Sequence, residues 1–120
     1  MTLNKLTYNS MDIAEVISDT PVITDAGSAL DLLMSASYEL GTKTILIDKR
    51  LICEDFFILS RGLAGEVLQK FVNYGGRIAI YGDFTRYTSK PLHDFIYESN
   101  KGRDVCFVPD RDTALAWLAK

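Results

Sequence analysis

The sequence is poor in the residues that most often hold metals. It has one histidine and two cysteines in 120 residues, and Cys53 and Cys106 are far apart without a CxxC spacing. Such a pair predicts reduced thiols used as small apolar side chains, and the run VCFV predicts burial of Cys106. His93 has no second histidine and no cysteine pair nearby, which argues against a zinc site. We expect no metal and no other cofactor.

The sequence also lacks long hydrophobic runs and an excess of positive charge. No apolar segment approaches the roughly 18 residues that span a bilayer, and the first ten residues lack the apolar core of a signal peptide. Lys and Arg number 13 against 16 Asp and Glu, a net charge of −3. This balance argues against a nucleic-acid-binding surface. We therefore expect a cytoplasmic protein that binds neither membrane nor nucleic acid, and whose partner is another protein or a second copy of itself.

What is present is the composition of a folded chain. Hydrophobic residues make up 48% and charged residues 24%, which is typical of a globular domain and excludes disorder. A length of 120 residues suits one domain with its own core, and no linker, repeat or low-complexity tract divides it. We expect a single domain over residues 1–120.

Short apolar strands alternate with amphipathic helical segments. Asn9-Ser10, between runs at 6–8 and 11–17, predicts a hairpin, because Asn tolerates the positive φ of a tight turn. Fully apolar strands are expected at 44–48, 78–81 and 105–108. Caps and glycines predict four helices, which begin near Asp25 or Ser28, Gly62, Ser89 and Asp110. This order predicts an α/β fold with a mixed, largely parallel sheet, an N-terminal hairpin and about four helices.

Helical spacing also predicts which side chains face the core. Each of the first three helices is expected to bury one face. In the third helix this face is a stripe of Leu92, Phe95 and Ile96, which leaves His93 toward solvent. The expected faces of the first two helices are Ala26, Leu30, Leu33, Met34 and Ser37, and Ala64, Val67, Leu68, Phe71 and Val72. Ala114, Leu115 and Leu118 are expected to face inward from the last helix.

The stretch LSRGLAGEVL, residues 59–68, opens the second helix. Ser60 is interpreted as its N-cap, and Gly65 as a point of close backbone approach to a neighbouring strand. The stretch matches neither a P-loop nor a dinucleotide fingerprint. A helix N-terminus with Arg61 beside it leaves anion binding open as an alternative.

Polar residues gather where the predicted parallel strands end and the next helices begin. In open α/β sheets this edge is where ligands bind. Ten polar or glycine residues fall there: Asp48, Ser60, Arg61, Gly62, Asp83, Thr85, Arg86, Ser89, Lys90 and Asp110. From this edge we select an interaction rim, defined as Ser60, Arg61, Gly62, Asp83, Tyr87 and Lys90.

Other chemistry at this edge is less well supported. Asp83 could act as a base or a metal ligand, but a carboxylate after a strand more often caps the following turn. A Ser60, His93 and Asp83 triad lacks the GxSxG elbow that would accompany it. An aromatic cluster is expected from Phe84, Tyr87 and Tyr97, with basic residues nearby. Such clusters are enriched in protein interfaces. The alternative is that these rings cover the sheet edge.

Three segments resemble STAS domains, the anti-sigma-factor antagonists and their relatives. They are TILID, LSRGLAGEVLQKFVNYGGRIAIYGD and VCFVPDRDTALAWLAK, and the resemblance covers about Ile45 to the C-terminus. It implies one STAS-like domain. In that family a serine in a Ser-Gly-Leu-Gly start of a helix accepts phosphate, and Arg61 occupies that position here. The resemblance therefore implies a module without the usual phosphoacceptor, with phosphorylation of Ser60 as the remaining route.

A closer resemblance is to a small bacterial family known as a domain of unknown function. That family carries a run much like GLAGEVLQKFVNYGGRIAIYGDFTRYTSKPLHDFIYESNKG. The resemblance implies a bacterial setting and no particular activity. Together these features predict a non-enzymatic regulatory or scaffolding module that binds a protein partner through the interaction rim. The alternative is a small-molecule or anion-binding domain, possibly an enzyme, that uses the same edge.

Overall fold

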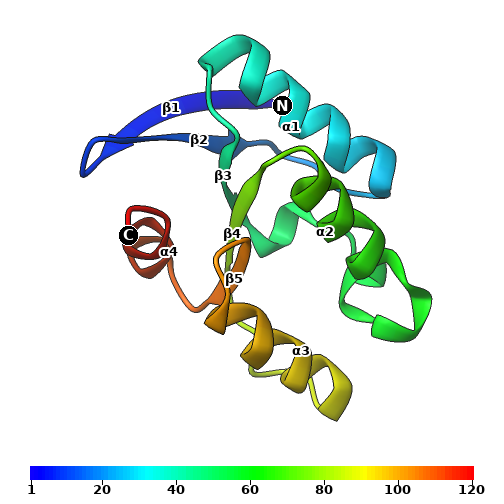
Figure 1. Ribbon diagram of the computed structural model, residues 1–120. Helices are drawn as coiled ribbons and strands as arrows, with labels where there is room; N and C mark the ends of the chain where they lie inside the picture. Colours follow the sequence, from blue (N-terminus) through cyan, green and yellow to red (C-terminus); the bar gives the residue numbers. More distant parts are fainter.

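The computed structural model describes all 120 residues and begins with the expected hairpin (Figure 1). Strands β1 (Thr2–Tyr8) and β2 (Met11–Ile17) pair antiparallel over their whole length. The turn between them places Asn9 at φ 50° and Ser10 at φ 68°. Two successive positive φ angles match the twist of the strands that the turn joins, as two-residue hairpin loops require. The hairpin prediction is confirmed.

Three parallel strands complete a five-stranded sheet in the order β1-β2-β3-β4-β5. They are β3 (Thr44–Asp48), β4 (Arg77–Tyr81) and β5 (Val105–Val108). Because each strand is added next to the one before it, right-handed crossovers place the connecting helices on the same face. Those helices are α1 (Ala26–Leu40), α2 (Leu63–Asn73) and α3 (Lys90–Lys101). The α/β architecture with a mixed sheet is confirmed.

The fourth helix, α4 (Arg111–Leu118), follows β5 and turns back over the other face. One cluster of 21 buried residues lies between the sheet and α1, α2 and α3, whereas 7 buried residues join α4 to β2, β3, β4 and β5. Alternation along the strands supplies both clusters, since Ile45 and Ile47 belong to the first and Leu46 to the second. The face of the sheet that carries α1, α2 and α3 therefore holds most of the core.

Caps fix three helix starts where the sequence predicts them. Asp25 accepts a bond from the Ser28 amide and forms a capping box, Ser89 accepts from the Leu92 amide, and Asp110 accepts from the Thr113 amide. Each bond satisfies one of the free N–H groups in a first helical turn. The hydrogen bond to the Ser28 amide is the main reason that the pKa of Asp25 is lowered.

The prediction that α2 begins near Gly62 is confirmed, but the roles predicted for Ser60 and Gly65 are wrong. Ser60 lies in a short 3₁₀ turn, η3 (Leu59–Arg61), and makes no capping bond. Gly62, at φ 80°, is the residue that precedes the helix, because a left-handed conformation is needed to turn from η3 into α2. A Cβ on Gly65 would meet no atom within 4 Å, so this glycine permits no close approach. The close approach is at Gly76, where a Cβ would lie 2.8 Å from Leu33.

Two expected helix faces need correction. Helix α1 buries Ala29, Leu32, Leu33 and Ala36, while Met34 is exposed. Of the expected residues of α1, only Leu33 is fully buried, because the helix is rotated so that its alanines meet the sheet. In α2 the expected Val72 is 51% exposed, whereas Ala64, Val67 and Phe71 are buried as predicted. The inward residues of α4 are confirmed.

The connection from β3 to α2 is the longest irregular segment that joins a strand to a helix. It contains η1 (Lys49–Leu51), η2 (Glu54–Phe57) and η3. Phe56 and Phe57 are buried in it, and its Ile52 forms a parallel bridge with Ile23. The connection therefore packs as part of the core beside the carboxyl end of β3.

Candidate functional site

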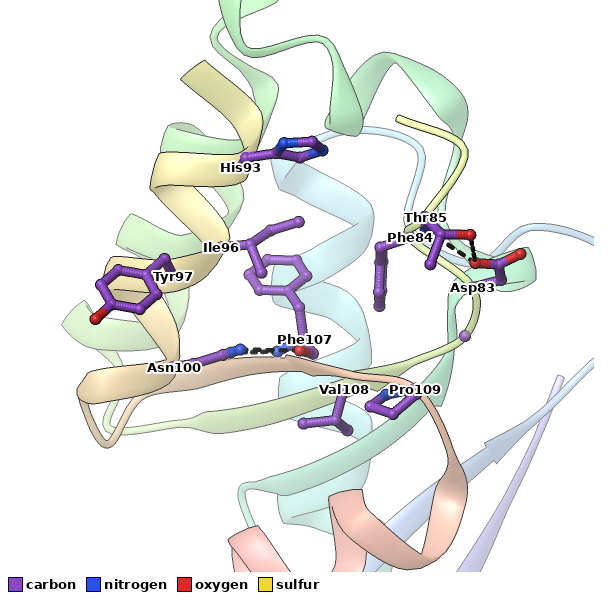
Figure 2. Close-up of a pocket in the computed structure, with 11 residues that line it drawn as sticks. Asp83, Phe84, Thr85, His93, Ile96, Tyr97, Asn100, Phe107, Val108 and Pro109 are labelled. Atoms are coloured by element: carbon purple, nitrogen blue, oxygen red, sulfur yellow. Dashed lines mark hydrogen bonds between the residues drawn. The ribbon is translucent and has the colours of Figure 1, made fainter. Parts of the chain in front are cut away.

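A hollow of about 590 Å³ opens beside α3, at the carboxyl ends of β4 and β5 (Figure 2). We call it the α3 hollow. Three segments form its walls: the loop after β4, the exposed side of α3 and the end of β5. Its 11 lining residues are Gly82, Asp83, Phe84, Thr85, His93, Ile96, Tyr97, Asn100, Phe107, Val108 and Pro109.

Asp83 fixes the loop that leaves β4. Its Oδ1 accepts hydrogen bonds from the Thr85 amide, at 2.9 Å, and from the Thr85 hydroxyl. The hydroxyl bond, followed by the amide bond, holds the pKa of this exposed carboxyl below its ordinary value. Asp83 therefore caps the turn, as the preferred interpretation of the sequence predicts.

His93 closes the upper side of the α3 hollow. Its ring reaches from α3 toward the loop (Figure 2), where Nε2 contacts the backbone carbonyl oxygen of Tyr87. His93 is exposed as expected, but it is also a link between α3 and the loop. Ser60 does not line the α3 hollow, so the arrangement does not assemble a triad from Ser60, His93 and Asp83.

Asn100 joins the other end of α3 to β5. Its side-chain amide donates to the Phe107 carbonyl oxygen at 3.0 Å, and its Oδ1 accepts from the Phe107 amide at 2.7 Å. A side chain that pairs with both backbone groups of one residue extends β5 at its free edge. It also holds α3 at a fixed distance from the strand, which keeps the hollow open.

Aromatic side chains form the floor of the α3 hollow. The Phe84 and Phe107 rings meet edge to face, with centroids 5.7 Å apart. Phe84 also lies 5.9 Å from Phe57, which stacks on Tyr87 at 5.3 Å. Phe84 and Tyr87 thus cluster as predicted, with their own centroids 6.4 Å apart, whereas Tyr97 stands apart on α3 and is 63% exposed.

A second hollow, of about 450 Å³, lies on the other side of Tyr87. We call it the Ser60 hollow. Its lining includes Ser60, Tyr87 and Arg86, together with Ser89 and Pro91 at the start of α3. The structure therefore brings two members of the interaction rim, Ser60 and Tyr87, into one hollow.

One carboxylate and two cations link the connections after β3 and β4. Glu54 accepts hydrogen bonds from Arg86 and from the Tyr87 hydroxyl, and lies 3.9 Å from the Lys49 ammonium. Lys49 also sits over the Tyr87 ring, 4.9 Å from its centroid. Hydrogen bonding to Tyr87, together with the charge of Glu54, raises the pKa of Arg86.

The other three rim residues lie outside both hollows. Arg61 and Gly62 are exposed between η3 and α2. Lys90 is exposed in the first turn of α3, with its ammonium 2.6 Å from the Asp94 carboxylate. All three share the predicted edge of the sheet but contribute no lining side chain.

Four residues of the α3 hollow lie on one helix: His93, Ile96, Tyr97 and Asn100. Sequence reasoning named the first three in separate roles, did not group them into one face, and missed Asn100. Their spacing of three, four and seven residues defines one face of α3. This face is next to the apolar stripe of Leu92 and Phe95. Because it mixes polar and apolar residues, a search for apolar spacing does not identify it. The regular spacing is the signal that could have found it.

A third hollow, of about 420 Å³ and lined by no hydrophobic residue, lies between the connections after β3 and β4. No group of three or more His, Cys, Asp or Glu side chains is placed to hold a metal ion. Cys106 is fully buried, which raises the pKa of its thiol to about 12. None of the helices has the length and apolar character needed to cross a bilayer.

The fold and these hollows define an α/β domain with a cavity at the carboxyl ends of its parallel strands β4 and β5. A family model described as a domain of unknown function, DUF4180, matches residues 8–118, so the chain belongs to the DUF4180 family. Comparisons with curated proteins and with solved structures gave no match.

Proposed function

We propose that this domain is a non-enzymatic, STAS-like regulatory or scaffolding module of the bacterial cytoplasm, which docks an apolar group of a partner protein in the α3 hollow. The observation that carries the proposal is that the polar side chains of the hollow are engaged within the chain. Asp83 holds Thr85, His93 contacts the Tyr87 carbonyl oxygen, and Asn100 brackets Phe107. Groups used in this way shape a cavity rather than act on a substrate.

The walls of the hollow suit protein recognition. Aromatic side chains are enriched where proteins bind one another, and Tyr97 presents a largely exposed ring at the edge of the cavity. The STAS-like part of the proposal is supported by the order of elements: a hairpin, alternating helices and strands, and a closing helix rich in Ala and Leu. Arg61 occupies the phosphoacceptor position of that resemblance, so recognition here works without the usual phosphoserine.

A second candidate is binding of a small molecule in the same hollow. Its volume of about 590 Å³ falls within the range of roughly 300–1,000 Å³ that is usual for ligand sites. A thermal-shift screen with the purified protein separates the candidates, since a free ligand stabilises the folded state without any partner.

The partner hypothesis is tested by affinity purification from the native cell, followed by mass spectrometry. Tyr97→Ala removes an exposed ring at the hollow, and Tyr38→Ala removes a ring that is 92% exposed on α1 and far along the chain from it. We expect the wild type and Y38A to retain the same partner and Y97A to lose it. Equal retention by all three proteins would overturn the proposal.

A further inference from the structure

The two edges of the sheet are finished differently. β5 ends the sheet on one side, where the Asn100 side chain hydrogen-bonds both backbone groups of Phe107. β1 ends it on the other side as the outermost strand (Figure 1). The backbone of its seven residues makes no hydrogen bond outside the ladder with β2. An unpaired strand edge of this length is a template for pairing with another strand.

The hairpin geometry identifies which backbone groups of β1 are free. Tyr8 and Met11 flank the two-residue turn, and the residues next to such a turn exchange both of their backbone hydrogen bonds. Hydrogen-bonded and non-hydrogen-bonded pairs alternate along an antiparallel ladder. The even-numbered residues of β1 therefore bond to β2, whereas Leu3, Lys5 and Thr7 direct their N–H and C=O groups toward the free edge.

The lysine of β1 does not guard this edge. Edge strands often carry a charged side chain, Lys above all, that deters another strand. The Lys5 ammonium instead lies 3.6 Å from the Asp12 carboxylate of β2, and the Thr7 hydroxyl donates to the same carboxylate at 3.0 Å. Both side chains are therefore directed toward β2 rather than across the free edge.

The two faces of β1 differ in polarity. Leu6 pairs with Ile13, and both pack in the cluster that joins α4 to the sheet. Tyr8, which is 38% exposed, lies on the same face because residues two apart on a strand share a face. Lys5 and Thr7 lie on the opposite face. A strand that fits this edge must be apolar on the α4 face and polar on the other, and β1 itself has this pattern.

We infer that a second copy of the chain pairs its β1 antiparallel with this strand, about a two-fold axis at Leu6. The axis crosses the sheet, so each face continues as the same face of the second copy. On the α4 face, Ile13 and Leu6 then meet Leu6 and Ile13 of the second copy in one apolar row. On the other face, Lys5 lies opposite the Thr7 that neighbours Asp12 of the second copy, which is a charge complementarity that the chain supplies to itself.

Other two-fold registers match less well. An axis at Lys5 would place two ammonium groups opposite each other, and like charges in that position are destabilising. An axis at Asn4 would place Leu6 opposite Thr2, which buries less apolar surface. The register at Leu6 joins two sheets into one continuous sheet. It does not use the α3 hollow, which lies beside β4 and β5, so the inference goes beyond the proposed function.

The mass of the full chain in solution is the first test. Sedimentation equilibrium from micromolar to millimolar concentration should show a reversible dimer of the 13.4 kDa chain. Thr7→Pro removes an N–H that faces the second copy and none that faces β2, so the hairpin should form and the dimer should weaken about tenfold or more. Tyr97→Ala, at the α3 hollow, is the control and should dimerise like the wild type.

Three results of this measurement would overturn the inference. They are a monomer at every concentration, a T7P dimer as strong as that of the wild type, and loss of the dimer in Y97A. The last result would place the contact at the α3 hollow instead of the β1 edge.

Cross-linking tests the register and does not depend on the folding of T7P. Non-hydrogen-bonded residues directly opposite each other have Cα atoms about 4.5 Å apart, which suits a disulfide. With diamide as oxidant, we expect Leu6→Cys to cross-link readily. Lys5→Cys should do so far less, because its two Cα atoms would be diagonal and about 7–8 Å apart. The wild type, with Cys106 buried and Cys53 partly buried, gives the background. An L6C protein at background level, or K5C cross-linking more than L6C, would contradict the inferred pairing.

Discussion

Two connections leave the carboxyl ends of neighbouring parallel strands, and they are built differently. The connection after β3, residues 49–62, buries Phe56 and Phe57 and bonds through its backbone to residues 22 and 23. The connection after β4, residues 82–89, is held mainly by side chains, through Asp83, Glu54 and His93. The first belongs to the core, whereas the second forms walls of both hollows.

The difference divides one edge of the sheet into a half that is filled by the core and a half that carries the two hollows. The same topological position that usually holds a ligand is filled, after β3, by the chain's own aromatic residues. After β4 the chain is too short to fill the space, and Phe84 and Tyr87 remain half-buried. Variants in the two connections should therefore differ in how much stability they cost and in how much of the molecule they disturb.

The largest effect is expected in the first connection. Phe56 is 1% exposed, so Phe56→Ala leaves a cavity and should lower the free energy of unfolding by about 3–5 kcal/mol. Chemical denaturation measures the loss. A loss below about 1 kcal/mol would show that the connection is not part of the core.

A smaller loss is expected at the base of the second connection. Gly82 has φ 154°, and a Cβ there would lie 2.7 Å from the Lys49 Cβ. Gly82→Ala should therefore cost roughly 1–3 kcal/mol and displace the loop. Gly65→Ala is the matched control, because open space surrounds that helical position and alanine should stabilise α2 by roughly 0.5–1 kcal/mol. Similar results for the two variants in denaturation would contradict this account.

Removal of a side-chain tie should loosen the second connection alone. Glu54→Gln weakens the contacts with Arg86 and Lys49. Because Glu54 and Arg86 are exposed, global stability should change by less than about 1 kcal/mol. Hydrogen exchange at residues 86–89 should accelerate, while exchange at residues 51–57 stays unchanged. Acceleration in both segments would mean that they open together.

The smallest effect is a dependence on pH. The pKa of Asp83 is lowered in the folded state, so its contribution is present at neutral pH and is lost as pH falls through the folded pKa. The amide of Thr85 should lose protection, beyond the intrinsic pH dependence of exchange, over that acidic interval. D83N should abolish this transition, and its persistence in D83N would assign it to another group.

The sequence predicts the regular part of the molecule well and the site only in part. Alternating apolar runs and the caps Ser89 and Asp110 act locally, so the strands and three helix starts are found without tertiary information. Ser60 fails as a cap because it lies inside η3, and the left-handed Gly62 that ends this turn determines where α2 begins. Asn100 and His93 could not be assigned, because their partners are backbone atoms that only tertiary structure brings near.

The most direct test of the central claim is hydrogen exchange of the domain in complex with the partner that it captures. We predict new protection at residues 83–85, 93–100 and 107–108, the three walls of the α3 hollow, with little change elsewhere. Protection confined to the exposed side of α1 around Tyr38, or to the free edge of β1, with the hollow unchanged, would contradict the account.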